Sequence, residues 1–103
     1  MGYFILDDLN NPIEVDVDSA SVWFAKNTHR QIVAFTEISK KCFLSTVFLT
    51  VNHKGSTKKP MLFESLWFGG IFDGCEIQYE SWENAFAGHF LLVQQYRKAS
   101  RNL

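Results

Sequence analysis

Four stretches that favour a β-sheet follow one another closely in the middle of the chain. Each is rich in β-branched or aromatic residues, which suit a half-buried sheet surface: Gln31–Ser39, Cys42–Asn52, Met61–Phe68 and the shorter Glu76–Tyr79. Turn-forming glycines at Gly69-Gly70 and Gly74 separate the last two stretches. This succession predicts an antiparallel meander.

A long amphipathic segment follows these strands. Ser81 suits a helix N-cap, and the basic residues Arg97, Lys98 and Arg101 suit the negative end of the helix dipole. Apolar residues recur at three- and four-residue spacing, which predicts one buried stripe: Trp82, Ala85, Phe86, His89, Val93 and Tyr96, widened by Phe90 and Leu92. Gly88 costs a helix interior about 1 kcal/mol, so we expect close packing against the sheet there.

The first part of the chain predicts a hairpin and a short helix. Tyr3–Leu6 and Ile13–Val17 form the hairpin, and a helix capped by Asp18 or Ser19 continues to about Asn27. The fold class predicted is α+β, with a meander of about four to six strands, this short helix and the longer C-terminal helix packed on it. All 103 residues are expected to form one domain, because 47% of them are hydrophobic and ten are Phe.

Composition excludes several classes of protein. The formal net charge is −1, so general attraction to nucleic acid or to anionic membranes is not expected. No apolar run approaches the roughly 20 residues of a membrane helix. Cys42 and Cys75 are too few for a cysteine-based zinc site, and no other metal or cofactor is expected. A disulfide between them is one alternative, but an intracellular protein with free thiols is the default.

His89 and Glu64 form the most interesting pair of titratable residues. The stripe draws His89 toward the core, and Glu64 shares a predicted strand face with Leu62 and Leu66. One interpretation is an acid/base pair, joined by His53 at a strand end. The commoner role is a buried hydrogen bond, with Glu64 or Ser65 as the partner of His89, that fixes the register of helix and sheet.

The most basic segment is the predicted loop between the second and third strands. His53, Lys54, Lys58 and Lys59 lie within it and are the candidate binding residues. They can contact phosphates or a protein partner, although such loops are more often solvated hairpin tips. A complementary acidic stretch comes earlier in the chain, at Asp7, Asp8, Glu14, Asp16 and Asp18.

Three short motifs occur in order along the chain. They are Ser45–Leu49 followed by Asn52-His53, then Leu62–Gly70, then Tyr79–Trp82 leading through Ala85 to Gly88-His89. Together, from Ile32 to Val93 and near Trp23, they resemble a family of small uncharacterised proteins encoded by bacteriophages and prophages. The resemblance implies a phage origin and carries no assigned activity. It singles out His53, Glu64, Gly69, Gly70, Trp82 and His89, and Asn52 stands where the family usually has Asp.

The sequence is therefore compatible with three hypotheses for the function. The first is a non-enzymatic phage accessory protein in the host bacterial cytoplasm that binds a host protein or complex and inhibits CRISPR or another defence system. The second is a protein that sequesters a small ligand or nucleotide through Lys54, Lys58 or His53. The third is a small enzyme that uses His53, Glu64 and His89. A homodimer through an exposed strand edge is a further expectation.

Overall fold

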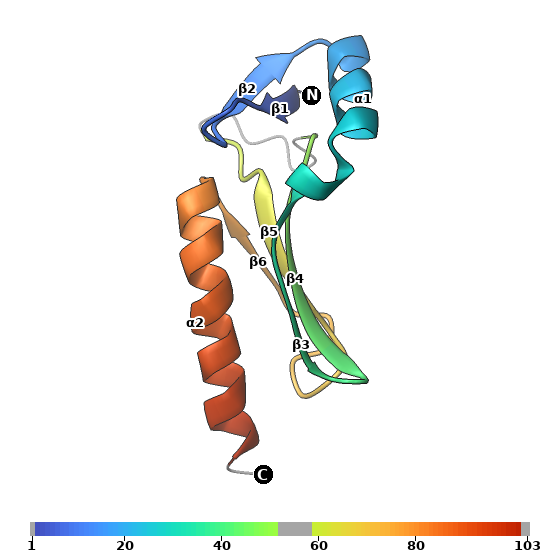
Figure 1. Ribbon diagram of the computed structural model, residues 1–103. Helices are drawn as coiled ribbons and strands as arrows, with labels where there is room; N and C mark the ends of the chain where they lie inside the picture. The colour runs from blue at the N-terminus through green and yellow to red at the C-terminus, as the bar shows by residue number, and fades with distance from the viewer. Residues whose placement is uncertain (1, 52–58, 102–103) are drawn as a thin grey trace.

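The computed structural model describes residues 2–51 and 59–101. Over these residues the chain forms an α+β fold, which confirms the predicted class (Figure 1). The elements, in chain order, are β1 (Tyr3–Leu6), β2 (Pro12–Val15), α1 (Val17–Lys26), the 3-10 turn η1 (Thr28–Gln31), β3 (Ile32–Ser39), β4 (Cys42–Phe48), β5 (Phe63–Phe68), β6 (Glu76–Tyr79) and α2 (Trp82–Ser100).

The predicted meander is the central sheet. Its strands lie in the order β3-β4-β5-β6, and every neighbouring pair is antiparallel. Burial alternates strictly along β4, with Cys42, Leu44, Thr46 and Phe48 buried and the residues between them half-buried. That alternation places one face of the sheet against α2, which runs alongside it in Figure 1.

The N-terminal hairpin, β1 and β2, lies at one end of this sheet together with α1 (Figure 1). β4 ends at Phe48, and the predicted strand end at Asn52 lies outside the described residues. The Leu49 amide donates to the Leu62 carbonyl at 2.7 Å, and the Thr50 carbonyl accepts a hydrogen bond from the Phe4 amide at 2.8 Å. The first bond continues the pairing of β4 with β5, and the second joins β1 of the hairpin to the segment after β4.

The helix α1 begins earlier than the sequence indicated. Its N-cap is Asp16, whose carboxylate accepts a hydrogen bond from the Ser19 amide at 2.7 Å. The same bond holds the pKa of Asp16 below its usual range. The predicted caps, Asp18 and Ser19, instead lie in the first turn, where Asp18 faces the positive end of the helix dipole.

The long helix α2 follows the predicted boundaries, with Ser81 as its N-cap. Only the narrow stripe of Ala85, His89, Val93 and Tyr96 is buried. Phe86 and Phe90, which were predicted to belong to the buried stripe, are about half exposed and contact each other edge to face. A single sheet face contacts one side of a helix, so the wider apolar surface of α2 stays in solvent.

Two glycine positions are required by the local geometry. Gly69 and Gly70 both have positive φ, 78° and 75°, in the turn after β5. The Gly69 amide donates to the Asp73 carboxylate at 2.7 Å, which closes this turn. A side chain at Gly70 would collide with the Tyr96 hydroxyl and the Cys42 sulfur. This pair therefore serves the turn and the packing beneath it.

Gly88 of α2 provides a test of the helix–sheet packing. A Cβ atom there would collide with the ring of Tyr79 on β6, which confirms the predicted close approach. Gly88→Ala should therefore lower the free energy of unfolding by about 1–3 kcal/mol, although the same change in an exposed helix stabilises by about 1 kcal/mol. Chemical denaturation measures the change. Stabilisation by Gly88→Ala would contradict this close packing. In a Tyr79→Ala background, where the colliding ring is absent, Gly88→Ala should no longer destabilise the protein.

Candidate interaction surface and the buried polar network

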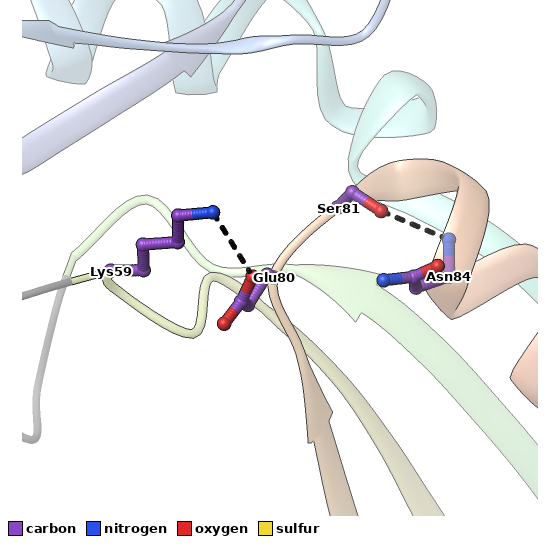
Figure 2. Close-up of polar contacts among 4 residues, drawn as sticks. All are labelled: Lys59, Glu80, Ser81 and Asn84. Carbon is purple, nitrogen blue, oxygen red and sulfur yellow. Dashed lines mark hydrogen bonds and ion pairs between the residues drawn. The ribbon is translucent and has the colours of Figure 1, made fainter.

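Of the predicted basic site, the structure describes Lys59 alone; His53, Lys54 and Lys58 lie outside the described residues. The Lys59 ammonium is 3.8 Å from the Glu80 carboxylate, with side chains 77% and 48% exposed (Figure 2). An ion pair this exposed contributes at most about 1 kcal/mol. Beside this ion pair, the Ser81 hydroxyl accepts a hydrogen bond from the backbone amide of Asn84 at 3.1 Å and caps α2 (Figure 2).

His89 is sealed between α2 and the sheet, with 0% of the residue exposed. Its Nε2 atom is 2.8 Å from the Thr36 hydroxyl on β3, and its Nδ1 atom is 2.7 Å from the Thr46 hydroxyl on β4. A neutral imidazole donates from one nitrogen and accepts at the other, and a threonine hydroxyl can do either. Both ring nitrogens therefore have partners.

The hydrogen bonds continue across the sheet from His89. The Thr46 hydroxyl is 2.5 Å from the Ser65 hydroxyl on β5, which is 3.1 Å from the Tyr79 hydroxyl on β6. These contacts cross all four strands of the sheet. We call this set, Thr36, Thr46, Ser65, Tyr79 and His89, the hydroxyl–imidazole network. Among the described residues, no buried polar side-chain atom lacks a hydrogen-bond partner.

The predicted pairing of His89 with Glu64 is wrong. Glu64 lies between Phe63 and Ser65, both buried toward α2, and successive strand residues point to opposite faces. Its carboxylate therefore lies on the other face, where it accepts a hydrogen bond from the side-chain amide of Gln78 at 3.3 Å. The alternative partner named from the sequence, Ser65, does lie on the correct face, but Thr46 stands between it and His89. Glu64 and His89 thus form no acid/base pair.

The described residues offer little for metal or thiol chemistry. Across residues 2–51 and 59–101, no group of three or more His, Cys, Asp or Glu side chains is placed to hold a metal ion. Cys42 is buried, Cys75 is exposed, and both are free, so the disulfide alternative is wrong. Within the same residues, no helix combines the length and apolar character that a membrane crossing requires.

The sheet face that points away from α2 is covered by no described element, as Figure 1 shows. The register identifies the residues that line it. On β3 and β4 they are Ile32, Phe35, Glu37, Phe43, Ser45 and Val47; on β5 and β6 they are Glu64, Leu66, Phe68, Glu76 and Gln78. We call this surface the open face of the sheet.

Three phenylalanine rings form a row across the open face. The rings of Phe35 and Phe43 have centroids 5.1 Å apart, and those of Phe43 and Phe68 stack with centroids 4.7 Å apart. The outer two are 55% and 41% exposed. Aromatic cross-strand pairs stabilise a sheet, but rings left this exposed on a small protein also mark a surface for association.

Acidic residues flank this aromatic row. Glu37 is directly opposite Phe43 in the register, Glu64 is opposite Val47, and Glu76 is opposite Leu66. Among the eleven residues of the open face there is no Lys, Arg or His. Lys40 and Lys41 lie in the turn between β3 and β4, and Arg30 precedes β3. The open face is therefore apolar with a negative border.

This surface was not predicted from the sequence. The alternation along β3 predicts Val33 and Phe35 on one face, but the β3–β4 register shifts between Ile32 and Ala34. Val33 is consequently buried while Phe35 faces solvent. The alternation of Phe43, Ser45 and Val47 with buried neighbours was a usable signal, but it could not say that only one face would be covered.

Comparisons with protein-family models, with curated proteins and with solved structures each found no match to this chain.

The burial of His89 predicts a dependence of stability on pH. Burial holds the pKa of His89 below 6.5, its ordinary value, because the charged ring would lose its hydration. Below about pH 6.5 the unfolded chain binds a proton at this residue that the folded chain resists. The contribution of His89 to the free energy of unfolding should therefore be constant above that pH and fall as the pH drops toward 5.

Denaturant titrations at a series of pH values measure this effect. His89→Gln should be destabilised at every pH by about 2–4 kcal/mol, because Thr36 and Thr46 lose their partner, and it should have a shallower pH slope between 6.5 and 5. His29→Gln, at a residue outside the network, should keep the wild-type slope. An unchanged slope in His89→Gln would show that another group causes the dependence.

Proposed function

We propose that this chain is a phage-encoded accessory protein that acts by binding a host protein in the bacterial cytoplasm and thereby inhibits a defence system such as CRISPR. The proposal that the protein acts by binding is supported by the open face, an apolar sheet surface with an exposed row of aromatic rings. The phage origin rests on the three motifs between Ile32 and Val93. Because its surface and not a catalytic cluster is the prominent feature, the protein acts by occupying its partner.

The chemistry of the open face defines the kind of partner. Phe35, Phe43 and Phe68 offer apolar contact, and aromatic residues frequently supply most of the binding energy of an interface. Glu37 and Glu64 add negative charge beside them. A complementary partner therefore presents apolar side chains flanked by Lys or Arg. The same carboxylates repel phosphate groups, which disfavours nucleic acid as the occupant of this face.

A second copy of the chain is a poorer occupant of the open face. Two open faces packed together bring acidic borders into one interface with no cation from the same face to offset them. Like charges held together in this way oppose association. A homodimer through the open face is thus disfavoured, and a basic partner is favoured; the homodimer predicted from the sequence would instead form through an exposed strand edge.

The test begins with the identification of a stoichiometric partner by affinity capture from lysate of the infected host, followed by affinity measurement with purified components. Phe35→Ser combined with Phe68→Ser should weaken binding by about 30-fold or more, the usual effect of truncating interface aromatics. Phe90→Ser is the matched control, since Phe90 is equally exposed but lies on the outer side of α2. Equal loss in the control would contradict the role of the open face.

Charge reversal tests the polar part of the proposal. Glu37→Lys with Glu64→Lys should slow association with the basic partner and weaken binding by about tenfold, with an effect that shrinks at high salt. Lys54→Glu, Lys58→Glu and Lys59→Glu test the basic loop in parallel. If binding persists through the loop reversals, the loop has no part in it. If it persists through the glutamate reversals, the partner is not basic at this contact.

A further inference from the structure

A second candidate site lies on the opposite, covered side of the sheet. A pocket of about 190 Å³ opens between α2, the turn after β5 and the edge of the sheet at β6. Its apolar lining comes from Trp67, Phe72, Ile77 and Leu92, and its polar lining includes Ser65 and Gln95. None of these residues belongs to the open face, so this site is independent of the proposed function.

The pocket exists because α2 does not cover the edge strand completely. Ile77 lies opposite Ser65 in the register and so belongs to the face that α2 covers. It is nevertheless 44% exposed, whereas Trp67 on the neighbouring strand is buried. β6 is four residues long and forms the last strand of the sheet. An apolar residue of the covered face is therefore left beside a hollow.

The size of the pocket limits what it can hold. An apolar cavity of about 150 Å³ accommodates a benzene molecule, so a volume of about 190 Å³ fits a single aromatic ring with one small substituent. The apolar walls favour such a ring over a charged ligand. Trp67 and Phe72 lie in mutual ring contact, with centroids 6.0 Å apart, and present aromatic surface to it.

Ser65 supplies a polar group in the lining. It is 1% exposed, and its hydroxyl contacts the Thr46 and Tyr79 hydroxyls. A serine hydroxyl has one donor and two acceptor positions, so these two contacts leave one position for a ligand. A ligand hydroxyl can donate or accept, and therefore complements whichever position remains.

We infer that this pocket binds a small aromatic molecule of one ring that carries a hydroxyl group, with the ring between Trp67, Ile77 and Leu92 and the hydroxyl at Ser65. The hydroxyl of the ligand then extends the hydroxyl–imidazole network. Recognition of this kind distinguishes a phenol from a hydrocarbon of the same shape, because only the phenol satisfies the free position on Ser65.

Phenol and toluene provide a matched pair of probes, since they differ by a hydroxyl in place of a methyl group. Amide chemical shifts of the full chain, recorded during titration, should show saturable phenol binding with a dissociation constant of about 1 mM, as expected for so small a ligand. The shifted residues should surround the pocket. Toluene should bind at least about threefold more weakly, despite its greater hydrophobicity.

Two tryptophan variants test the location. Ile77→Trp fills the pocket from its exposed rim and should weaken phenol binding at least tenfold. Leu91→Trp adds the same side chain to the exposed surface of α2, next to Leu92 but outside the lining, and should bind phenol as the wild type does. Because both positions are exposed, neither change threatens folding.

Three results would overturn the inference. The first is the absence of saturable phenol binding to the wild type, and the second is equal binding by Ile77→Trp. The third is toluene binding as tightly as phenol, which would show an apolar pocket without the Ser65 contact. Ser65→Ala removes the proposed hydrogen bond, so this variant should bind phenol no more tightly than toluene. Adding Ile77→Trp to Ser65→Ala should still block the binding of both ligands.

Discussion

The imidazole of His89 joins the long helix to two strands of the sheet at once. It projects from the centre of the buried stripe of α2 and forms hydrogen bonds with the Thr36 hydroxyl on β3 and the Thr46 hydroxyl on β4. Directional bonds of this kind fix where the helix lies and which strands it crosses, which apolar contact alone does less sharply. An apolar residue in place of Thr46 or Thr36 would leave one buried ring nitrogen of His89 without a hydrogen-bond partner. The three residues therefore depend on one another.

That anchoring also determines the face of the sheet that stays open. With His89 bound to Thr36 and Thr46, α2 covers the face that carries Leu44, Phe63 and Trp67, and these residues are buried. The described chain supplies no second long helix for the other face. Phe35 and Phe68 therefore remain exposed, and the surface proposed to bind a partner follows from the same interaction that holds the core together.

Much of this fold could be predicted from local patterns. The alternation in Cys42–Phe48 and the cap at Ser81 indicate a strand and a helix boundary directly. Gly88 indicated close packing because a glycine within a helix needs a compensating reason. These features were predictable because each depends on neighbours in the sequence. The Asp16 cap was missed by two residues, because several adjacent side chains could serve as the cap.

The candidate surface was harder to predict because it depends on long-range geometry. The register shift before Ala34 reverses the face of Phe35, and no pattern in the sequence signals it. Glu64 appeared to share a face with buried Leu62, but Leu62 precedes β5 and does not follow its alternation. His89 was correctly expected in the core, whereas its threonine partners come from strands 43 and 53 residues away.

The proposed binding surface requires that one face of the sheet is covered and the other is open in the free protein. Solvent paramagnetic relaxation, measured on ring protons with a soluble gadolinium chelate, tests it directly. If α2 covers only one face, Phe35 and Phe68 should relax strongly and Phe63, which is buried on the covered face, almost not at all. Protection of Phe35 and Phe68 equal to that of Phe63 would show that another segment or a second copy covers the open face.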